Sequence, residues 1–335
     1  MAKICVTGGA GYVGSHTANR LLQAGFEVLV VDNLSTGFRA SVAKNVDFIE
    51  ADVRDFAALN TILNKHRVDC VIHCAAMLNV AESIQKPLEY YDNNVNGMLS
   101  LLRACEMNAI DKIVFSSSGT IYGNESPLQL IKEDSPLKPI SPYGFSKLFC
   151  EQLLADVVRK GIRSVVLRYF NAAGATVDLT NGQRTLHAYH LIHLAAQAAV
   201  GSREGVAIFG VDYPTEDGSC IRDYIHIDDL AEIHLLSVRH LFNGGSSEVF
   251  NCGYGTGFSV KQVVNTMQLV SGTNFPIKES PRRPGDPACL IANPEKIKSK
   301  LQWFPKHDSL KTICRSAYEW EMLTFQHNTM LLSGR

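Results

Sequence analysis

Short apolar runs rich in β-branched residues alternate with helical segments through the first half of the chain, and this alternation restricts the fold more than any other feature. Runs such as Val28–Val31 are apolar at every position, as strands covered by helices on both faces must be. We therefore expect an α/β fold built on a doubly wound parallel sheet. The pattern predicts strands at Lys3–Thr7, Glu27–Asp32, Val46–Val53, Val68–Ala76, Lys112–Ser118 and Ser164–Asn171, and helices at Tyr12–Gln23, Phe56–Lys65, Leu88–Asn108 and Pro142–Lys160.

The regular alternation ends near residue 172, where longer loops and shorter strands begin. We expect a first domain at residues 1–172 and a smaller α/β lobe at 173–335, with a terminal helix near Leu310–Thr324. Tyr224–Leu241 again has the pattern of a strand followed by a long helix, and we expect it to return to the first domain. A chain of 335 residues that is 46% hydrophobic can bury a core for both parts.

Charge and hydropathy argue against two classes of partner. The chain has 32 Lys+Arg and 33 Asp+Glu, for a formal net charge of -1, and no dense basic run that could follow a phosphate backbone. No apolar stretch approaches the roughly 18 residues that a membrane-spanning helix needs. We expect neither a nucleic acid nor a membrane as a partner.

Two features predict a cytoplasmic location. The first predicted strand begins almost at the initiator Met, which leaves no room for a cleavable signal peptide. The nine cysteines are scattered singly, without a CxxC pair, as buried thiols in a reducing compartment are.

Two segments contain spaced metal-ligating residue types, and we expect a metal in neither. On a strand, Cys70 and Cys74 share one face while His73 points to the other, so the three side chains cannot converge and core packing is favoured. His187, His190 and His193 have helical spacing but no acidic partner beside them. For this histidine row, packing or contact with a bound ligand is favoured over metal binding.

A glycine-rich turn joins the first predicted strand to the first predicted helix, with glycines at Gly8, Gly11 and Gly14. Glycine at these places permits a tight turn, the approach of a pyrophosphate to the helix N-terminus, and close packing of helix on strand. The context predicts a Rossmann-type dinucleotide site; a glycine turn that only packs is the alternative.

Acidic residues after the next two strands refine this prediction. Asp32 ends the second strand about eighteen residues after Gly14, where a carboxylate can bind the ribose hydroxyls. Its charge would repel a 2′-phosphate, and the nearest arginine is Arg39, so NAD is favoured over NADP. Asp52 and Val53, at the end of the third strand, are candidates for contact with the adenine edge, and a surface turn is nearly as well supported.

A phenol and an ammonium group lie one helical turn apart at Tyr143 and Lys147. A lysine at that distance stabilises phenolate and makes the tyrosine a usable general base. Ser118 ends a preceding strand at the edge where open α/β sheets bind ligands, so its hydroxyl can share the substrate oxygen that Tyr143 deprotonates.

The glycine turn, Ser118 and the Tyr143-x-x-x-Lys147 pair resemble the extended short-chain dehydrogenase/reductase superfamily. Longer motifs narrow the resemblance to the UDP-glucose 4-epimerase family, from residue 2 to about 321. Dehydratases of the superfamily carry an Asp-Glu pair directly after the hydroxyl residue, whereas this chain has Gly119-Thr120, so elimination of water is disfavoured. The motifs are Lys86–Gly97, Arg168–Asn171, Ile208–Gly210, Thr215–Gly218, Ile221–His226, Arg283–Asp286 and Trp303–His307.

The resemblance implies an isomerase that interconverts UDP-glucose and UDP-galactose with tightly bound NAD, by transient oxidation at sugar C4 and hydride return to the rotated 4-keto sugar. Residues 1–172 then form the NAD-binding domain and 173–335 the UDP-sugar-binding domain. Tyr143 is the implied base, Ser118 shares its hydrogen bond, and Lys147 tunes Tyr143 and holds the nicotinamide ribose. Further cofactor contacts are implied at Tyr12, Val13, Asn33, Asn93 and Tyr169, and UDP contacts at Asn171, Arg222, Arg283 and Asp286.

The resemblance also implies a homodimer, formed through the helices at Leu88–Asn108 and Tyr143–Lys160. By the resemblance, Leu290 falls where the family has a residue beside the sugar C2 substituent. Because leucine is intermediate in size, its volume alone does not decide whether N-acetylated sugars are accepted. The alternative is that Leu290 packs in the core. For Arg222, the alternative to UDP binding is a structural salt bridge with Asp223. Other functions to weigh are a different UDP-sugar 4-epimerase, a net NAD-dependent dehydrogenase or reductase, and a non-catalytic NAD-binding regulator.

Overall fold

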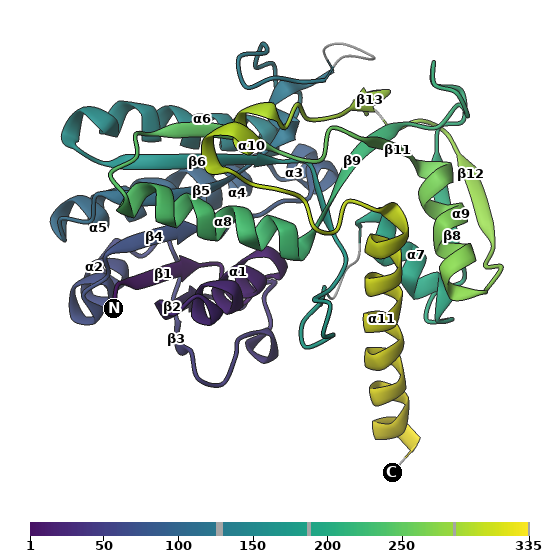
Figure 1. Cartoon of the computed structure of the whole chain (residues 1–335), viewed down its shortest axis with the longest axis horizontal. Coiled ribbons are helices and arrows are strands. Elements are labelled where there is room, and N and C mark those ends of the chain that lie inside the picture. Colours follow the sequence, from purple (N-terminus) through teal and green to yellow (C-terminus); the bar gives the residue numbers. More distant parts are fainter. Residues whose placement is uncertain (125–129, 186–188, 284–285, 334–335) are drawn as a thin grey trace.

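Seven parallel strands form one large sheet at the centre of the protein, in the order β10-β6-β5-β4-β1-β2-β3 (Figure 1). The computed structural model describes residues 1–124, 130–185, 189–283 and 286–333, the last of these as backbone alone from residue 327. The predicted doubly wound parallel fold is confirmed. The sheet consists of β1 (Lys3–Thr7), β2 (Glu27–Asp32), β3 (Asp47–Glu50), β4 (Cys70–His73), β5 (Lys112–Ser118), β6 (Arg163–Tyr169) and β10 (Glu248–Cys252).

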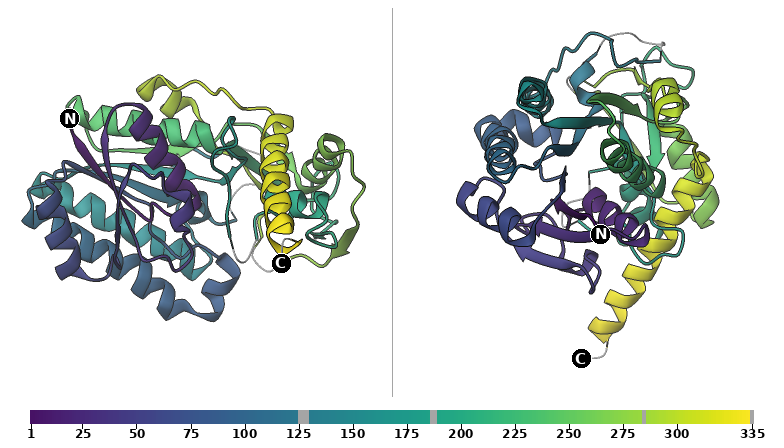
Figure 2. Two further views of the ribbon diagram at one scale, coloured as in Figure 1. Left: turned by 90° about the horizontal axis from the view of Figure 1, so that it is seen from below. Right: turned by 60° about the vertical axis from the view of Figure 1, so that its left-hand side comes forward.

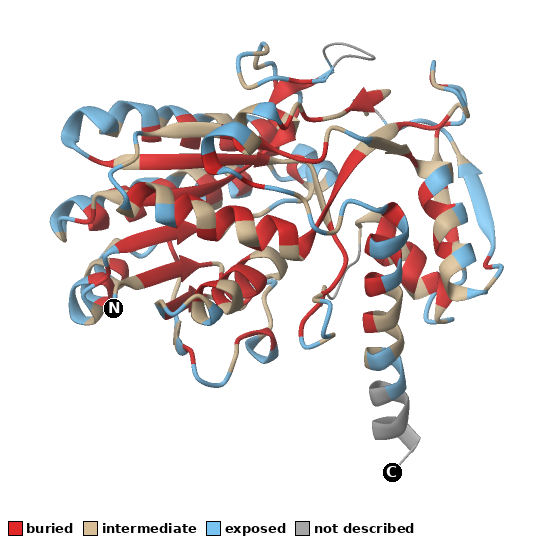
Figure 3. Cartoon of the chain, viewed as in Figure 1, coloured by how far each residue is buried: buried red, intermediate tan, exposed pale blue. Residues whose placement is uncertain are grey.

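Helices cover both faces of this sheet, and the strands are buried between them (Figure 3). Alternate residues along each strand enter different cores: Val28 and Val30 pack with α1 (Tyr12–Gln23) and α8 (Ile227–Phe242), whereas Leu29 and Val31 pack on the opposite face. This two-sided burial explains the continuous apolar runs in the sequence. The opposite face is covered by α2 (Phe56–His66), α5 (Gly97–Met107) and α6 (Pro142–Val157).

A smaller lobe lies beyond the carboxyl ends of the large sheet (Figure 2). Its strand β9 (Ile221–His226) pairs with β7 (Asn171–Ala173), β11 (Gly257–Ser259) and β13 (Cys289–Leu290). A separate pair joins β8 (Val206–Phe209) to β12 (Ile277–Ser280). The lobe's helices α7 (Leu191–Ala199), α9 (Val260–Ser271) and α11 (Leu310–Ser333) pack on one another, and α10 (Glu295–Leu301) packs on β10.

Several predicted boundaries differ from the observed ones. The strand expected at Val46–Val53 is only β3, because β3 is an edge strand that pairs solely with the end of β2. The single helix expected at Leu88–Asn108 is interrupted by a π-helical turn, η2 (Asp92–Asn96), between α4 (Pro87–Tyr91) and α5. The strand at Val68–Ala76 shortens to β4, and the terminal helix extends to Ser333. Further short elements are α3 (Val80–Gln85) and the 3-10 turns η1 (Arg39–Ser41), η3 (Gly119–Tyr122) and η4 (Val158–Lys160).

The chain returns to the large sheet after it has entered the smaller lobe. Helix α8 packs against α1, β5 and β6, and β10 pairs with β6 as the outermost strand. The division near residue 172 stays a prediction. Within the described ranges, no helix combines the length and the apolar character that a membrane span requires.

Candidate active site

The glycine turn between β1 and α1 is packed so tightly that side chains are excluded. Gly8 has a φ of 70°, and a Cβ there would lie 2.5 Å from the backbone nitrogen of Ala75. A Cβ on Gly14 would lie 2.2 Å from the carbonyl oxygen of Gly8. No side chain caps α1, which starts at Tyr12 directly after Gly11, so the first amide groups of the helix are left for an anionic ligand.

The carboxylate of Asp32 is held beside this turn at the end of β2. Its two oxygens accept hydrogen bonds from the backbone amides of Ala10 (3.0 Å) and Leu34 (2.8 Å). Burial raises the pKa of Asp32, and these two bonds oppose the rise. Each oxygen keeps a lone pair that a ribose hydroxyl can use.

Asn33 and Asp52 are brought together at the next corner of the sheet. Asn33 Nδ2 donates to Asp52 Oδ2 over 3.0 Å, and Arg54 holds the same carboxylate through Nε and Nη2 at 3.0 and 2.8 Å. The bonds from Arg54 keep the pKa of Asp52 well below its usual range. The side chain of Val53 packs in the core, where a Cβ on Gly97 would lie 2.9 Å from it.

Tyr143 and Lys147 project from the first turns of α6, whose start is fixed by a Ser141 cap and by Pro142. Both side chains are buried, with 8% of Tyr143 and 3% of Lys147 exposed. Lys147 Nζ donates to the carbonyl oxygen of Ser116 over 2.8 Å and lies 6.0 Å from the centroid of the Tyr143 ring. Burial raises the pKa of Tyr143 to about 12 and lowers the pKa of Lys147.

Ser118 supplies the contact that opposes the rise of the Tyr143 pKa caused by burial. Its hydroxyl accepts hydrogen bonds from the amide and the hydroxyl of Thr120 at 3.2 and 3.0 Å. A further hydrogen bond joins Ser118 to Tyr143 and lowers the Tyr143 pKa, because it favours the phenolate. Tyr169 stands opposite Ser118 in the β5–β6 pairing. In the sequence, Thr120 was noted only because Gly119-Thr120 stands where dehydratases have an acidic pair. The hydrogen bonds of Thr120 to Ser118 were not predicted.

Arg222 and Asp286, both predicted to bind UDP, form an ion pair in the smaller lobe. Arg222 Nη2 donates to Asp286 Oδ1 over 2.6 Å. Asp223 is not the partner of Arg222, because its carboxylate accepts three backbone amides: Tyr254 (3.0 Å), Gly255 (3.1 Å) and Ala292 (3.2 Å). The alternative of an Arg222–Asp223 salt bridge is therefore wrong.

The other predicted UDP residues lie around this pair. Asn171 Nδ2 donates to the carbonyl oxygen of Asp223 over 3.3 Å. The guanidinium of Arg283 lies 3.9 Å from the centroid of the Phe209 ring. Leu290 is 8% exposed and packs with Ile121, which follows Ser118 by three residues. Strand β13 therefore contacts the segment that carries Ser118.

The sequence of this chain matches a protein-family model over most of its length. The model of the NAD dependent epimerase/dehydratase family matches residues 4–253. The chain belongs to this family. Among curated members, the UDP-glucose 4-epimerase of Azospirillum brasilense is 49% identical over 320 residues, covering 95% of this chain and 92% of that protein. The UDP-glucose 4-epimerase of Halalkalibacterium halodurans is 48% identical over 319 residues, 95% of each chain.

Solved structures from the family superpose closely on this chain. The UDP-glucose 4-epimerase from Brucella ovis in complex with NAD has a TM-score of 0.92 and 41% identity, over 96% of this chain and 99% of that one. The UDP-glucose 4-epimerase from Bifidobacterium longum in complex with NAD+ and UDP has a TM-score of 0.91 and 36% identity, over 96% and 98% of the two chains. The resemblance inferred from the motifs is confirmed.

The residues of this family member fit an NAD molecule. Side chains are excluded at Gly8 and Gly14, no side chain caps the N-terminal end of α1, and the Asp32 carboxylate is oriented next to both. These three features are what a pyrophosphate and an adjacent ribose require. Gly11, Tyr12 and Val13 would lie along the pyrophosphate, with Asp32 and Asn33 at the ribose.

Asn94 is a site residue that the sequence analysis missed. It lies in the π-helical turn η2 next to the predicted contact Asn93, whose Nδ2 donates to Asn94 Oδ1 over 2.9 Å. Asn94 Oδ1 also accepts from the amide of Met77, and its Nδ2 donates to Ser146 Oγ, both at 2.9 Å. It thus joins the loop after β4 to the helix of Tyr143. A π-turn often marks a functional site, but the sequence carries no signal for one.

The described histidines among those singled out in the sequence contact different partners. His187 lies outside the described residues. His190 precedes α7 and lies 2.9 Å from Gln183 Nε2, whereas His193 lies inside α7, 3.1 Å from Gln197 Nε2. His73 Nδ1 is 2.7 Å from Thr7 Oγ1, away from the face of Cys70.

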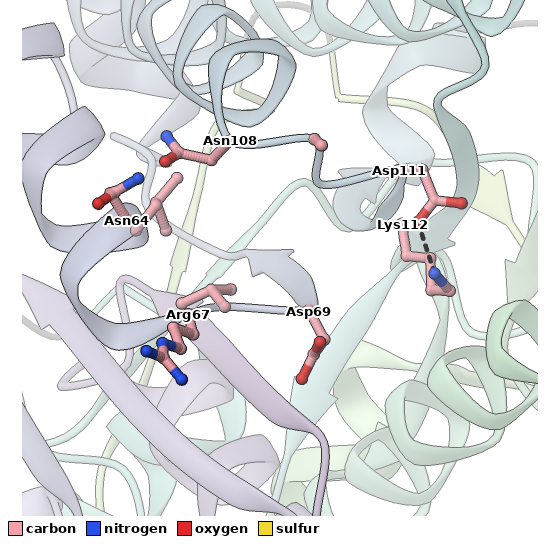
Figure 4. Close-up of a pocket in the computed structure, with 9 residues that line it drawn as sticks. Asn64, Arg67, Asp69, Asn108, Asp111 and Lys112 are labelled. Carbon is pink, nitrogen blue, oxygen red and sulfur yellow. Dashed lines mark hydrogen bonds and ion pairs between the residues drawn. The ribbon is translucent and has the colours of Figure 1, made fainter.

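A cavity of about 350 Å³ lies at the amino ends of β4 and β5 (Figure 4). Arg67, Asp69, Asp111 and Lys112 line it, and Lys112 already pairs with Asp111 at 2.5 Å. Ser118 ends β5 at its opposite, carboxyl end, so this cavity is separate from the candidate site.

Proposed function

We propose that the protein is a UDP-glucose 4-epimerase that interconverts UDP-glucose and UDP-galactose and retains its NAD during the reaction. The observation that carries the proposal is the buried group of Ser118, Tyr143 and Lys147 at the carboxyl edge of a dinucleotide-type sheet. Relatives with 40% to 49% identity over about 95% of the chain bear that enzyme's name.

Tyr143 is the proposed general base and acid at the sugar C4 hydroxyl. Ser118 bonds to its phenol oxygen and favours the charged form, while Lys147, anchored on Ser116, places a positive charge in the same buried space. Because Tyr143 and Lys147 are both shielded from water, a proton taken from the sugar stays available for return. NAD, held by the glycine turn and Asp32, would supply the acceptor for the C4 hydride and the means of its return to the other face of the sugar.

Arg222, Arg283, Asn171 and Asp286 are the proposed contacts of the UDP group. Guanidinium groups suit a diphosphate because their forked donors bind two oxygens at once. Arg222 is held at its place by Asp286, which leaves part of its fork for a ligand. Fixing the nucleotide at a distance from C4 lets the sugar turn while the UDP stays bound.

The residues after Ser118 support reversal of the oxidation over loss of water. An elimination needs a second acid and base beside the hydroxyl residue. A Cβ on Gly119 would lie 2.9 Å from the ring of Phe170, so an acidic side chain has no room there. Thr120 next to it bonds to Ser118 and is not an acid.

The function is tested by incubating the purified protein with UDP-galactose and measuring UDP-glucose with a coupling dehydrogenase. We expect UDP-glucose to form, NAD to remain with the protein, and no NADH to accumulate in the absence of the coupling enzyme. Release of one NADH per sugar would instead identify a net dehydrogenase, and absence of product with NAD bound would identify a non-catalytic member.

A homodimer is the proposed assembly. Leu88, Leu99, Phe145 and Phe149 are exposed on the helices α4, α5 and α6 that the sequence predicts to pair. The rings of Phe145 and Phe149 lie 6.4 Å apart and form one apolar surface with neighbouring Tyr91. Apolar surface of this kind on adjacent helices is typical of a subunit interface.

We also propose a cytoplasmic location. All nine cysteines are free, and eight of them are buried in the core. Unpaired cysteines are typical of proteins kept in a reducing compartment.

A further inference from the structure

Behind the Tyr–Lys pair lies a buried ion pair that the proposed chemistry does not use. Arg168 Nη2 donates to Glu151 Oε2 over 2.6 Å, and Arg168 Nε donates to Oε1 over 3.0 Å. The side chains of Arg168 and Glu151 are 5% and 8% exposed. Neither residue belongs to the proposed cofactor or substrate contacts.

Further hydrogen bonds hold this pair on both sides. Ser117 Oγ donates to Glu151 Oε1 over 2.5 Å. Arg168 Nη1 donates to the hydroxyl of Tyr122 over 2.8 Å and to the carbonyl oxygen of Glu133 over 3.0 Å. A buried ion pair of this kind adds little stability over apolar residues of equal volume, since desolvation offsets the attraction. The presence of this ion pair is therefore better explained by the position in which it holds its two structural elements than by a gain in stability.

The pair joins the two elements that carry the proposed catalytic residues. Glu151 follows Lys147 by one turn of α6 and Tyr143 by two turns. Its partner Ser117 stands in β5 between Ser116, which accepts the Lys147 ammonium, and Ser118. Helix α6 is thus tied to consecutive residues of β5 at two successive turns. A shift of the helix along the strand would break both ties and separate Tyr143 from Ser118.

We propose that Glu151, held by Arg168, is a positioning residue that sets α6 against β5 so that Tyr143 and Ser118 meet at the substrate. This inference rests on the proposed epimerase function. It assigns no contact between Glu151 and the sugar. It predicts a loss in the chemical step rather than in binding, because the UDP contacts lie in the other lobe.

The test compares variants that separate positioning from stability. Glu151→Gln leaves the Arg168 charge buried without a partner, so the protein should lose thermal stability as well as activity. The double variant Glu151→Leu/Arg168→Met removes both charges, and its melting temperature should recover to within a few degrees of wild type. Because α6 would still not be aligned with β5 in the double variant, its kcat for UDP-galactose should remain below that of wild type, on the order of tenfold to a hundredfold. KM should change by less than about threefold.

A less buried ion pair, with side chains 30% and 18% exposed, provides the control. Arg20 Nε donates to Glu232 Oε2 over 2.6 Å and joins α1 to α8, neither of which carries Tyr143 or Ser118. Glu232→Gln should leave kcat unchanged. Ser117→Ala, which removes only the tie to β5, should lower kcat by a smaller factor than the double variant.

Three outcomes decide the inference. A double variant with wild-type kcat, or a loss carried by KM alone, would overturn it and leave the pair a purely structural feature. An equal loss in Glu232→Gln would also overturn it, since any disturbed ion pair would then slow the enzyme. Failure of the wild type to epimerise UDP-galactose would refute the proposed function itself, and that measurement is made before any variant.

Discussion

Leu290 stands directly opposite Arg222 in the parallel pairing of β13 with β9. The residue predicted beside the sugar and the residue predicted at the diphosphate are therefore neighbours across two hydrogen-bonded strands. Arg222 also bonds Asp286, which leads into β13, so one short unit carries both contacts. We therefore expect a change of volume at Leu290 to alter the proposed sugar site through this unit.

Leu290→Tyr should narrow the sugar specificity. The Leu290 side chain packs with Ile121 and Tyr122, next to the segment that follows Ser118. A ring at this position needs more room than the cluster leaves, so it should extend toward the space of the sugar C2 substituent. We expect wild type to act efficiently on UDP-galactose and weakly on UDP-N-acetylgalactosamine, and the variant to lose the second activity preferentially. The measurement is kcat/KM for both substrates.

Leu137→Tyr is the control for this experiment, because Leu137 packs against the same cluster from another side. If Leu290→Tyr leaves the ratio of the two kcat/KM values unchanged, Leu290 is a core residue and the gate lies elsewhere. If Leu137→Tyr changes the ratio equally, the effect comes from general loosening of the cluster.

Tyr143→Phe should lower kcat by about a hundredfold or more, because it removes the general base. The ring remains to fill the buried space, so circular dichroism and NAD content should match wild type. Tyr318→Phe removes a hydroxyl from α11 and should have wild-type activity. A Tyr143→Phe enzyme with wild-type kcat would show that another group moves the proton.

Phe149→Glu should convert the dimer to a monomer. Phe149 is exposed on α6 next to Tyr91 and Phe145, and a charge there would be buried at the proposed interface. Light scattering at micromolar concentration should give twice the 36.8 kDa chain mass for wild type and the chain mass for the variant. Leu269→Glu, at an exposed leucine of α9, is the control and should stay dimeric. A wild-type mass near that of one chain would contradict the proposed assembly.

Acid should destabilise the protein below about pH 6.5, the pKa of histidine in an unfolded chain. Burial lowers the pKa of His234 to about 4 and of His73 to about 3, so the folded protein binds fewer protons than the unfolded chain in this interval. The stability contributed by each neutral histidine is complete above about pH 6.5. It is lost as pH falls toward the folded-state pKa, by about 1.4 kcal/mol per pH unit.

His234→Gln tests this contribution. His234 Nδ1 is 2.9 Å from the carbonyl oxygen of Leu230, and its Nε2 is 3.2 Å from Ser116 Oγ. The variant should have a lower free energy of unfolding than wild type at pH 7.5. Between pH 7.5 and 5, however, its free energy of unfolding should fall by about 2 kcal/mol less than that of wild type. Urea unfolding at the two pH values measures the difference, with His66→Gln, at a half-buried position at the end of α2, as the control substitution. An equal pH-dependent loss in His234→Gln and wild type would refute this role of His234.

The sheet was predictable from the sequence because its strands are buried on both faces. β1, β2 and β5 have the expected bounds, since each is buried at every position after its first residue. The edge strand β3 and the interruption of the Leu88–Asn108 helix were not predictable to the residue. The length of β3 is set by its pairing with a single neighbour, β2. The π-turn is accompanied by contacts of Asn94 with Met77 and Ser146.

Parts of the candidate site were predictable at positions where the residue type and its spacing along the chain indicate one particular chemical role. Gly8, Gly14, Asp32 and the Tyr143–Lys147 pair belong to this class. Arg222 was recognised, but its partner was not, because Asp223 is its neighbour in sequence while Asp286 is its neighbour in space. The roles of Thr120 and Asn94 depend on contacts between distant segments, which a single sequence does not reveal.

The late return of the chain to its first sheet has a consequence for synthesis and engineering. β6 gains its outer neighbour only when β10 has been made, after the smaller lobe has begun. A nascent or truncated chain ending near residue 172 would display β6 as an open edge, with one helical cover still missing. The lobes therefore cannot be exchanged between relatives by one crossover. A working chimera needs three, one near residue 172 and one on each side of the α8–β10 segment.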